Sequence, residues 1–135
     1  MNRHPLQWSV FMLEHNADAG EGTVSRLPVL VVSRESANDA LPVVTVLPLV
    51  GKKKGRRIYP NETWLPSDAT LLDTPTVLMA HQIRTIPKDW LATRMGSVDD
   101  PGLRAAVRNA VRIQLDLDAD TTHPSRGPTN MESGI

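Results

Sequence analysis

Two dense runs of aliphatic residues constrain the fold of this chain more than any other feature of its sequence. They are Pro28 to Ser33 (PVLVVS) and Leu41 to Val50 (LPVVTVLPLV). The first run is apolar on both faces, which is typical of a strand at the centre of a sheet or barrel. In the second run, Pro42 and Pro48 lack the amide that a ladder needs, so we expect them at its start and at its end or a bulge. The sequence therefore predicts two strands, the second of them kinked near Pro48.

Shorter segments bounded by turn-forming residues complete the expected fold. Trp8 to Leu13 (WSVFML) predicts a first strand, and the residues from His15 to Gly22 predict the loop that follows it. The other elements expected before the last helix are one helical turn at 33–40, strands at 58–65 and 76–86, and a short helix at 87–95. About five short strands with a C-terminal helix imply an α+β, mainly β fold built on a strongly bent sheet or small barrel.

The clearest amphipathic helix follows Asp99-Asp100-Pro101, which supplies an N-cap and a proline where a first helical turn accepts one. Apolar residues then recur at helical spacing, at Leu103, Val107, Ala110, Val111 and Leu115. This pattern predicts a helix over Pro101 to Leu117. From Asp118 onward apolar residues almost vanish, so we expect residues 1–117 to form the folded domain and residues 118–135 to be a disordered acidic tail.

The composition excludes several kinds of chemistry. The 135 residues leave room for one domain, and the absence of Cys removes disulfides, thiolate nucleophiles and Cys-ligated zinc. The four His residues have no zinc-like spacing, and the chain has neither a Walker-type phosphate loop nor a G-x-S-x-G elbow. We therefore expect no metal and no cofactor. Without a signal-peptide core or an apolar run of about 20 residues, the sequence predicts a soluble, cytoplasmic protein with no membrane partner.

A formal net charge of zero conceals a strongly basic segment. Residues 51–57 (GKKKGRR) carry five cations and no anion, namely Lys52, Lys53, Lys54, Arg56 and Arg57. Cations concentrated on one flexible connection can neutralise phosphates and release their counterions, although such a run is also typical of a solvated loop. Tyr59 and Trp64 follow closely, and aromatic faces beside cations suit the stacking of unpaired bases. Ordinary strand packing is the alternative for both aromatics, and for Trp64 we favour it.

The segment His81-Gln82-Ile83-Arg84-Thr85 brings an imidazole, an amide and a guanidinium into one expected strand. Side chains alternate along a strand, so His81, Ile83 and Thr85 would face one way while Gln82 and Arg84 face the other. The alternative role for Gln82 and Arg84 is to satisfy buried backbone groups or to make a dimer contact. For Arg84 we favour this alternative over direct catalysis.

The order and spacing of three segments resemble the MazF/PemK family of bacterial toxins, endoribonucleases that cut single-stranded RNA. The segments are PVLVVS at Pro28 to Ser33 followed by Asn38, LPVVTVLPL at Leu41 to Leu49, and HQIRTI at His81 to Ile86. With the final helix, the resemblance covers about Trp8 to Leu117. It implies an SH3-like barrel, a homodimer with RNA across or near the dimer face, and a cognate, MazE-like antitoxin whose C-terminal segment blocks that groove. Cleavage in this family needs no metal and no thiol.

The resemblance also implies a reaction. The ribose 2′-hydroxyl attacks the neighbouring phosphate in line and leaves a 2′,3′-cyclic phosphate and a 5′-hydroxyl. This step needs a proton acceptor, a proton donor and hydrogen-bond donors around the phosphorane. Family members generally carry an Arg before the proline of the second strand, a Thr or Ser at the end of the third strand and an acid in the first loop. Here those positions hold Leu27, Val50 and Gly22, with Arg26 and Glu21 directly before the first and the last of them.

Within this resemblance, and not from spacing, we take Arg26 and His81 as the candidate catalytic residues. Arg26 could reach the phosphate if the preceding loop bulges by one residue. His81 aligns where some family members carry an acid, and an imidazole could exchange protons there near neutral pH. The candidate RNA-binding residues are Lys52, Lys53, Lys54, Arg56, Arg57, Gln82 and Arg84.

Two other classes of function are open at this point. One is a catalytically degenerate binding module, which would engage the antitoxin or RNA without cleavage. The other is a gyrase-directed toxin of the CcdB kind, which shares the barrel but poisons a protein complex. The HQIRTI segment and the basic segment at 51–57 favour RNA over gyrase.

Overall fold

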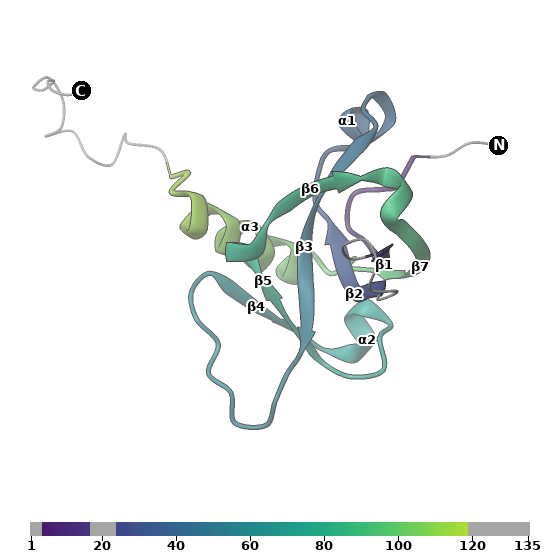
Figure 1. Ribbon diagram of the computed structural model, residues 1–135. Helices are drawn as coiled ribbons and strands as arrows, with labels where there is room; N and C mark the ends of the chain where they lie inside the picture. The colour runs from purple at the N-terminus through teal and green to yellow at the C-terminus, as the bar shows by residue number, and fades with distance from the viewer. Residues whose placement is uncertain (1–3, 17–23, 119–135) are drawn as a thin grey trace, which may run out of the picture.

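Figure 1 shows the computed structural model of the chain, which describes residues 4–16 and 24–118. Seven strands in these ranges form one antiparallel sheet in the order β4-β5-β3-β2-β1-β7, with β6 paired to β3 beside this path. The described helices include none that is long and apolar enough to cross a membrane. The tail expected at 118–135 falls outside the described residues except for Asp118, so it stays a prediction.

The elements alternate between short strands and single turns until the last helix. The strands are β1 (Ser9–Asn16), β2 (Val24–Val31), β3 (Val43–Gly51), β4 (Glu62–Leu65), β5 (Thr76–Met79), β6 (Arg84–Pro87) and β7 (Leu91–Ser97). The helices are α1 (Glu35–Ala40), α2 (Ser67–Thr70) and α3 (Pro101–Leu115), and two 3-10 turns are η1 (Ala80–Gln82) and η2 (Lys88–Trp90). The chain thus has seven described strands where the sequence predicts about five.

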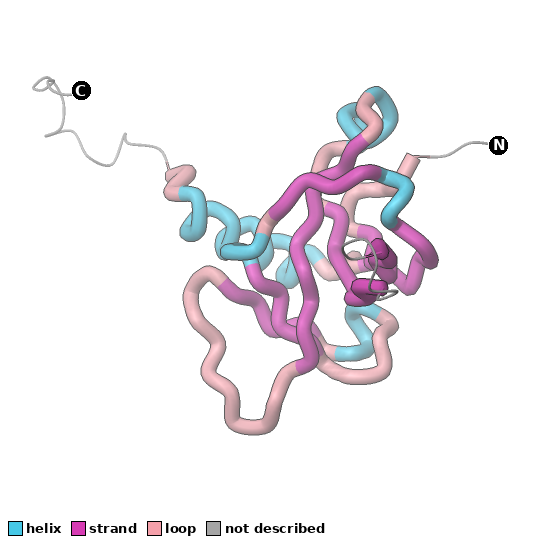
Figure 2. Tube along the Cα trace, viewed as in Figure 1, coloured by secondary structure: helices cyan, strands magenta, loops and turns pink. Residues whose placement is uncertain are grey.

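The α+β, mainly β class and the C-terminal helix are confirmed. In Figure 2 the magenta strands curve into a small, barrel-like sheet, and α3 lies along one side of it. The described strands do not close this barrel, because the strand order ends at β4 on one side and at β7 on the other.

The sheet bends around β3, which changes partners along its length. Residues 43–46 pair with β6, residues 46–48 pair with β2, and residues 49–51 pair with β5. Pro48 lies inside the strand, opposite Val29, directly before the change to β5. The expectation that Pro48 could end the strand is therefore wrong. A proline is tolerated here because the ladder is already passing from one partner to the next.

The strand expected at 76–86 is interrupted. Both β5 and β6 run along β3, but Leu78 pairs with Leu49 whereas Arg84 pairs with Val46. Leu78 and Arg84 are therefore six positions apart in the sequence, whereas their partners on β3 are only three positions apart. The three residues of η1 account for this difference. An insertion of this kind re-aims the inserted side chains beside a continuous partner strand.

The sheet carries an apolar cluster on each face. Leu30 and Leu47 are fully buried in the cluster beneath α3, together with Val107 of that helix. Val29 and Val46 belong to the second cluster, on the opposite face. Both β2 and β3 thus bury side chains on two faces, which confirms that the run at Pro28 to Ser33 forms a central strand and shows the same for β3.

The helix α3 begins where the sequence predicts. The side chain of Asp100 accepts a hydrogen bond from the backbone N–H of Leu103 at 2.9 Å, and a proline occupies the first turn. Val107 and Ala110 are buried against the sheet. The helix ends at Leu115, two residues before the expected end. N-cap, proline and apolar spacing therefore agree on this element.

Two expected elements differ from the structure. The strand expected at 58–65 begins only at Glu62, after an irregular segment that contains Pro60. The helix expected at 87–95 is wrong, because η2 is followed directly by β7, which pairs with β1. Trp90 and Leu91 pack against the second apolar cluster, and the backbone of β1 offers this segment a ladder. Tertiary pairing therefore overrides the local helical preference.

Candidate functional site

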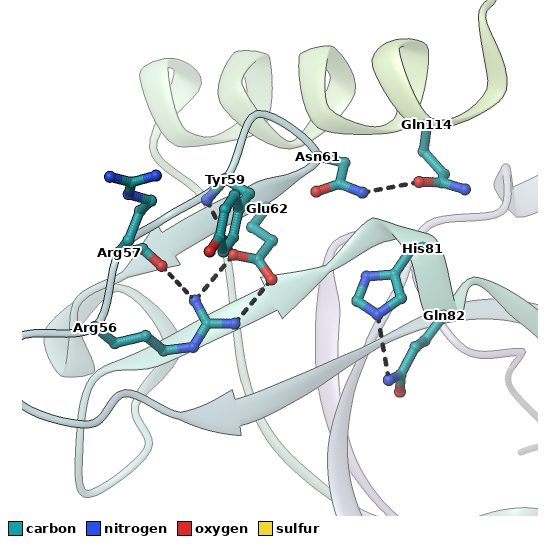
Figure 3. Close-up of polar contacts among 8 residues, drawn as sticks. All are labelled: Arg56, Arg57, Tyr59, Asn61, Glu62, His81, Gln82 and Gln114. Carbon is teal, nitrogen blue, oxygen red and sulfur yellow. Dashed lines mark hydrogen bonds and ion pairs between the residues drawn. The ribbon is translucent and has the colours of Figure 1, made fainter.

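The basic loop, which we define as residues 52–61 between β3 and β4, extends away from the sheet (Figure 1). Arg56 turns back from this loop onto Glu62. Nη1 and Nη2 of Arg56 donate to Oε1 and Oε2 of Glu62 at 2.9 and 2.8 Å (Figure 3). The N–H of Tyr59 donates to Oε1 of the same carboxylate at 3.0 Å. Since the Glu62 side chain is only 4% exposed, a nearly buried carboxylate holds the base of the loop.

This contact fixes the charge state of both partners. The hydrogen bond from Arg56 is the main cause that holds the pKa of Glu62 below its ordinary value of 4.5, and the N–H of Tyr59 acts in the same direction. The same hydrogen bond raises the pKa of Arg56. Both groups are therefore ionised at neutral pH. The guanidinium fork of Arg56, a predicted RNA-binding residue, is occupied by a carboxylate of its own chain.

The other four cations of the basic loop are differently placed. Lys53, Lys54 and Arg57 are exposed and Lys52 is half-buried. Within residues 4–16 and 24–118, none of the four forms an ion pair. The Arg57 guanidinium lies 5.9 Å from the centre of the Tyr59 ring, which is itself exposed. The loop thus presents positive charge and an aromatic face to solvent.

A cleft of about 850 Å³ separates the base of the basic loop from the end of α3. Its lining includes Arg56, Tyr59, Glu62, His81, Ile113 and Gln114. Nδ2 of Asn61 donates to Oε1 of Gln114 at 2.9 Å and so connects the loop to the helix (Figure 3). The cleft combines an aromatic face, an imidazole, amides and an exposed aliphatic side chain, a mixture that suits a nucleotide.

The turn η1 places the predicted catalytic His81 directly beside the predicted RNA-binding Gln82. Their Nε2 atoms lie 3.4 Å apart and both side chains are exposed (Figure 3). The expectation that these two side chains face opposite ways is wrong, because a 3-10 turn does not follow the alternation of a strand. His81 is therefore open to solvent at the edge of the cleft.

Arg84 begins β6, opposite Val46 of β3, and its side chain is exposed. No ion pair joins it to another residue in the described ranges. Next to it, Oγ1 of Thr85 lies 3.1 Å from Oγ1 of Thr45. The alternative in which Arg84 satisfies buried backbone groups is not observed. Its roles in binding RNA and in a dimer contact stay predictions.

Arg26 lies on β2, across from Glu14 of β1. Nη2 of Arg26 is 3.1 Å from Oε2 of Glu14, and both side chains are more than one-third exposed. Exposed ion pairs contribute about 0–1 kcal/mol, so this one opens at little cost. Among the described residues, no hydrogen bond or ion pair joins Arg26 to the other candidate catalytic residue, His81.

Leu27 and Val50 occupy the positions at which the resemblance implies an Arg and a Thr or Ser. Both are half-buried, and Leu27 packs against the second apolar cluster. The ladder between β2 and β3 ends at Val29 and Pro48, so Leu27 and Val50 each lie two residues beyond its end. This part of the sheet is therefore apolar. Gly22 and Glu21, at the position of the loop acid, lie outside the described residues.

Trp64 is exposed, although the sequence favours ordinary strand packing for it. It lies in the middle of β4 with 42% of its surface exposed, whereas its neighbours Thr63 and Leu65 are buried. The hydroxyl of Thr63 donates to the carbonyl oxygen of Ala106 in α3, so the alternation of β4 turns Trp64 away from the helix. The chain thus exposes a Trp side chain on β4, the strand that pairs with β5.

Sequence reasoning missed Glu62 and Gln114. The only signal for Glu62 is an acid six residues after Arg56, and a contact across an irregular loop follows no period. Gln114 is 53 residues away from Asn61, its partner. In the described ranges, no group of three or more His, Asp or Glu side chains is arranged to hold a metal ion.

The chain is similar to proteins of one kind. Residues 6–115 match the family model described as PemK-like, MazF-like toxin of type II toxin-antitoxin system. The endoribonuclease MazF of Staphylococcus saprophyticus is 27% identical over 96 residues, which make up 71% of this chain and 78% of that protein.

Solved structures agree with this match. An endoribonuclease in complex with its cognate antitoxin from a mycobacterial species is 28% identical, has a TM-score of 0.66, and the match covers 85% of this chain and 98% of that one. A MazE-MazF structure from Deinococcus radiodurans is 22% identical with a TM-score of 0.71, over 87% of this chain and 100% of that one, and supports the fold alone. Since the family model spans residues 6–115 of 135, the chain belongs to the PemK-like, MazF-like toxins of type II toxin-antitoxin systems.

Proposed function

We propose that this toxin is a metal-independent endoribonuclease, an mRNA interferase that cuts single-stranded RNA in the cytoplasm. The observation that carries the proposal is the arrangement at the basic loop. Lys52, Lys53, Lys54 and Arg57 are without an ion pair among the described residues, and Arg57 lies 5.9 Å from the centre of the exposed Tyr59 ring. A chain of phosphates can follow such cations, while the cleft next to them holds an accessible imidazole.

The proposed reaction is attack of a ribose 2′-hydroxyl on the adjacent phosphate. The 2′-oxygen forms a bond to phosphorus, the bond to the 5′-oxygen breaks, and the products are a 2′,3′-cyclic phosphate and a 5′-hydroxyl. His81 is the candidate for proton exchange, since an imidazole can both accept and donate a proton and this one faces solvent at the edge of the cleft. Arg26 is the candidate cation for the phosphorane, because its surface ion pair with Glu14 opens at little cost.

Cleavage should be slow in comparison with relatives that carry the expected Arg and hydroxyl. Val50 is similar in shape to threonine but cannot donate a hydrogen bond, and the loss of one transition-state donor commonly costs about 100- to 1,000-fold in rate. Leu27 offers no charge to the phosphate. The proposed partners are single-stranded RNA, a second copy of the chain in a homodimer, and a cognate MazE-like antitoxin. A relative at 28% identity is itself an endoribonuclease in complex with its cognate antitoxin.

The experiment is incubation of the purified protein with a mixed-sequence RNA in EDTA, followed by analysis of the RNA ends. We expect 2′,3′-cyclic phosphates and 5′-hydroxyls at high protein concentration, and faster production by the double variant Leu27→Arg, Val50→Thr. A His81→Ala protein is the matched control for proton exchange. If the wild type makes no such ends while the double variant does, the cleaving function of this chain is wrong.

The apolar pair Leu27 and Val50 favours a second candidate, a binding module that keeps the partners of the family without catalysis. This candidate predicts tight binding of the antitoxin with no growth arrest when the toxin is expressed alone. Growth arrest that disappears in the His81→Ala variant would contradict it.

A further inference from the structure

Trp64 stands apart from the other tryptophans of the chain. Trp8 is buried and Trp90 is half-buried, stacked on His15 with the ring centres 3.6 Å apart. Trp64 is 42% exposed in the middle of β4, an edge strand that pairs only with β5 among the described strands. Exposing an indole leaves a large apolar face in water, so this position needs an explanation other than packing.

The sheet aligns Trp64 with Val50, the position at which the resemblance implies a Thr or Ser. Trp64 pairs with Val77 of β5, and Val77 pairs with Val50 of β3. Directly paired residues of an antiparallel sheet lie on the same face, and neighbouring strands are about 4.8 Å apart. Val50 is therefore about 10 Å from Trp64, on the same face of the sheet. Val77, between them, is fully buried, whereas Trp64, on the strand at the edge of the sheet, is exposed.

The basic loop borders this row. Lys52 directly follows Gly51, which pairs with Thr76, and Thr76 in turn pairs with Leu65, the residue after Trp64. The N–H of Lys52 donates to the carbonyl oxygen of Pro75 at 3.1 Å, which keeps the start of the loop at this end of the sheet. The loop returns to the sheet at the first residue of β4 (Figure 1). The loop that carries the cations therefore starts two strands away from Trp64, at the level of Leu65, and ends at the first residue of its strand.

We propose that Trp64 is a stacking platform for one unpaired nucleobase of the RNA whose phosphates follow the basic loop. This rests on the proposed function and adds a base-binding residue to it, two strands away from Val50. The indole offers a flat apolar face to any base, while Lys52 and the exposed cations after it neutralise the backbone. Because Lys52 and the exposed cations after it favour a polyanion, the occupant we propose is RNA and not an apolar peptide.

The test measures the affinity of the full chain for a single-stranded oligonucleotide with 2′-O-methyl groups, which cannot be cleaved by 2′-hydroxyl attack. We expect Trp64→Leu to weaken binding about 5- to 150-fold, the range that one base stack contributes, and Trp64→Phe to retain most of the affinity. The dependence of affinity on salt should stay the same in both variants, because stacking releases no counterions. Leu41→Ala is the matched control, since Leu41 is equally exposed but lies beside α1, at the other end of β3.

Abasic nucleotides make the test specific to a base. One abasic position should weaken binding to the wild type and leave binding to Trp64→Leu unchanged. Equal binding by Trp64→Leu and wild type overturns the platform, and so does an equal abasic penalty in both proteins. A loss confined to the binding of an acidic antitoxin peptide would also overturn it and assign the surface to a protein partner. Absence of cyclic-phosphate ends with intact stacking would contradict the proposed cleavage alone.

Discussion

Arg56 and Glu62 form a two-pronged contact across the base of the basic loop, with N–O distances of 2.9 and 2.8 Å. Glu62 is six positions after Arg56, and it also accepts from the N–H of Tyr59, inside that span. The pair closes a small ring of chain at the point where the loop joins β4. The sequence predicts that Arg56 binds phosphate, as its basic neighbours do. In the free protein Arg56 instead anchors the loop to β4.

The first prediction concerns the stability that this pair supplies. Replacing Glu62 with Gln removes the charge-assisted bonds and should lower the free energy of unfolding at pH 7 by about 1–3 kcal/mol. Because the pKa of Glu62 is lowered in the folded protein, its contribution is complete above the ordinary value of 4.5 and is lost as the pH falls through the lower folded value. The difference between wild type and Glu62→Gln in urea unfolding should thus shrink below pH 4.5.

An exposed acid provides the control for this measurement. Asp68 is exposed on α2, and Asp68→Asn should change the free energy of unfolding by no more than about 0.5 kcal/mol. A Glu62→Gln protein as stable as Asp68→Asn would show that the contact contributes nothing. A difference that does not change between pH 7 and pH 3 would show that the charge of Glu62 makes no contribution to stability.

A second prediction separates the paired cation from the unpaired ones. For binding of single-stranded RNA, each neutralised phosphate contributes about 0.7 to the slope of log affinity against log salt. Lys53→Met should reduce the slope by about that amount, whereas Arg56→Met should leave it nearly unchanged because Glu62 already neutralises that guanidinium. Glu62→Gln should increase the slope, since it releases Arg56 to the RNA.

Titrations at several salt concentrations check this order. Lys54→Met is the matched comparison for Lys53→Met. It should reduce the slope by a similar amount, because both side chains are exposed on the same turn of the loop. If Arg56→Met reduces the slope as much as Lys53→Met does, RNA takes Arg56 away from Glu62, and the anchor is not maintained in the complex.

The central strands and the last helix were predictable because each has a local cause. The runs around Val29 and Val46 are apolar on two faces, and a strand between two apolar clusters is the arrangement that buries both. Asp100 has the side chain that an N-cap requires and accepts the expected bond from Leu103. These preferences need no knowledge of distant residues.

The rest of the fold depends on partners that are far away in the sequence. Nothing in residues 87–95 specifies that β1, some 80 residues earlier, offers them a ladder, so their local pattern predicts a helix where β7 forms. The residues inserted at η1 are recognisable only against the register of β3. The strand count and the boundaries near these segments therefore could not be derived from periodicity.

The residue types of the candidate site could be predicted from the sequence, but the contacts among those residues could not. The charge of the basic loop and the imidazole at His81 are visible in the sequence, and in the structure Lys53, Lys54, Arg57 and His81 are exposed. The use of Arg56 as an anchor and the exposure of Trp64 depend on how β4 is turned, with Thr63 toward α3. One residue of register decides which face of a strand meets solvent.

A third prediction concerns Gly96, a buried residue of β7 beside α2. A Cβ added there would overlap the carbonyl oxygen of Thr70 and lie 2.9 Å from Cβ of Leu71. Both contacts are with atoms close to the backbone, so they cannot be relieved by a rotamer change. Gly96→Ala should lower the free energy of unfolding by about 1–3 kcal/mol in a urea titration. Gly51→Ala is the control, because nothing lies within 4 Å of a Cβ at that position.

The last prediction concerns Asn38, which is fully buried between the N-terminal segment and the sheet. Its Nδ2 donates to the carbonyl oxygens of Pro5 and Ser33 at 2.9 and 3.0 Å, and its Oδ1 accepts from the Ser33 hydroxyl. The carbonyl oxygen of Asn38 also accepts from Nζ of Lys88 at 2.6 Å, a bond that any residue at this position can keep. The amide side chain therefore joins three segments of chain.

Asn38→Ala should leave the carbonyl groups of the half-buried Pro5 and Ser33 without that donor, at a cost of about 1–3 kcal/mol in total. Asn38→Asp has nearly the same shape but a carboxylate in place of the donor, so it should destabilise at least as strongly at pH 7. The exposed contact of Asn61 with Gln114 is the comparison, and Asn61→Ala should cost well under 1 kcal/mol in the same unfolding experiment. Equal stabilities of the Asn38→Asp and wild-type proteins would show that the two donated bonds contribute nothing to the fold.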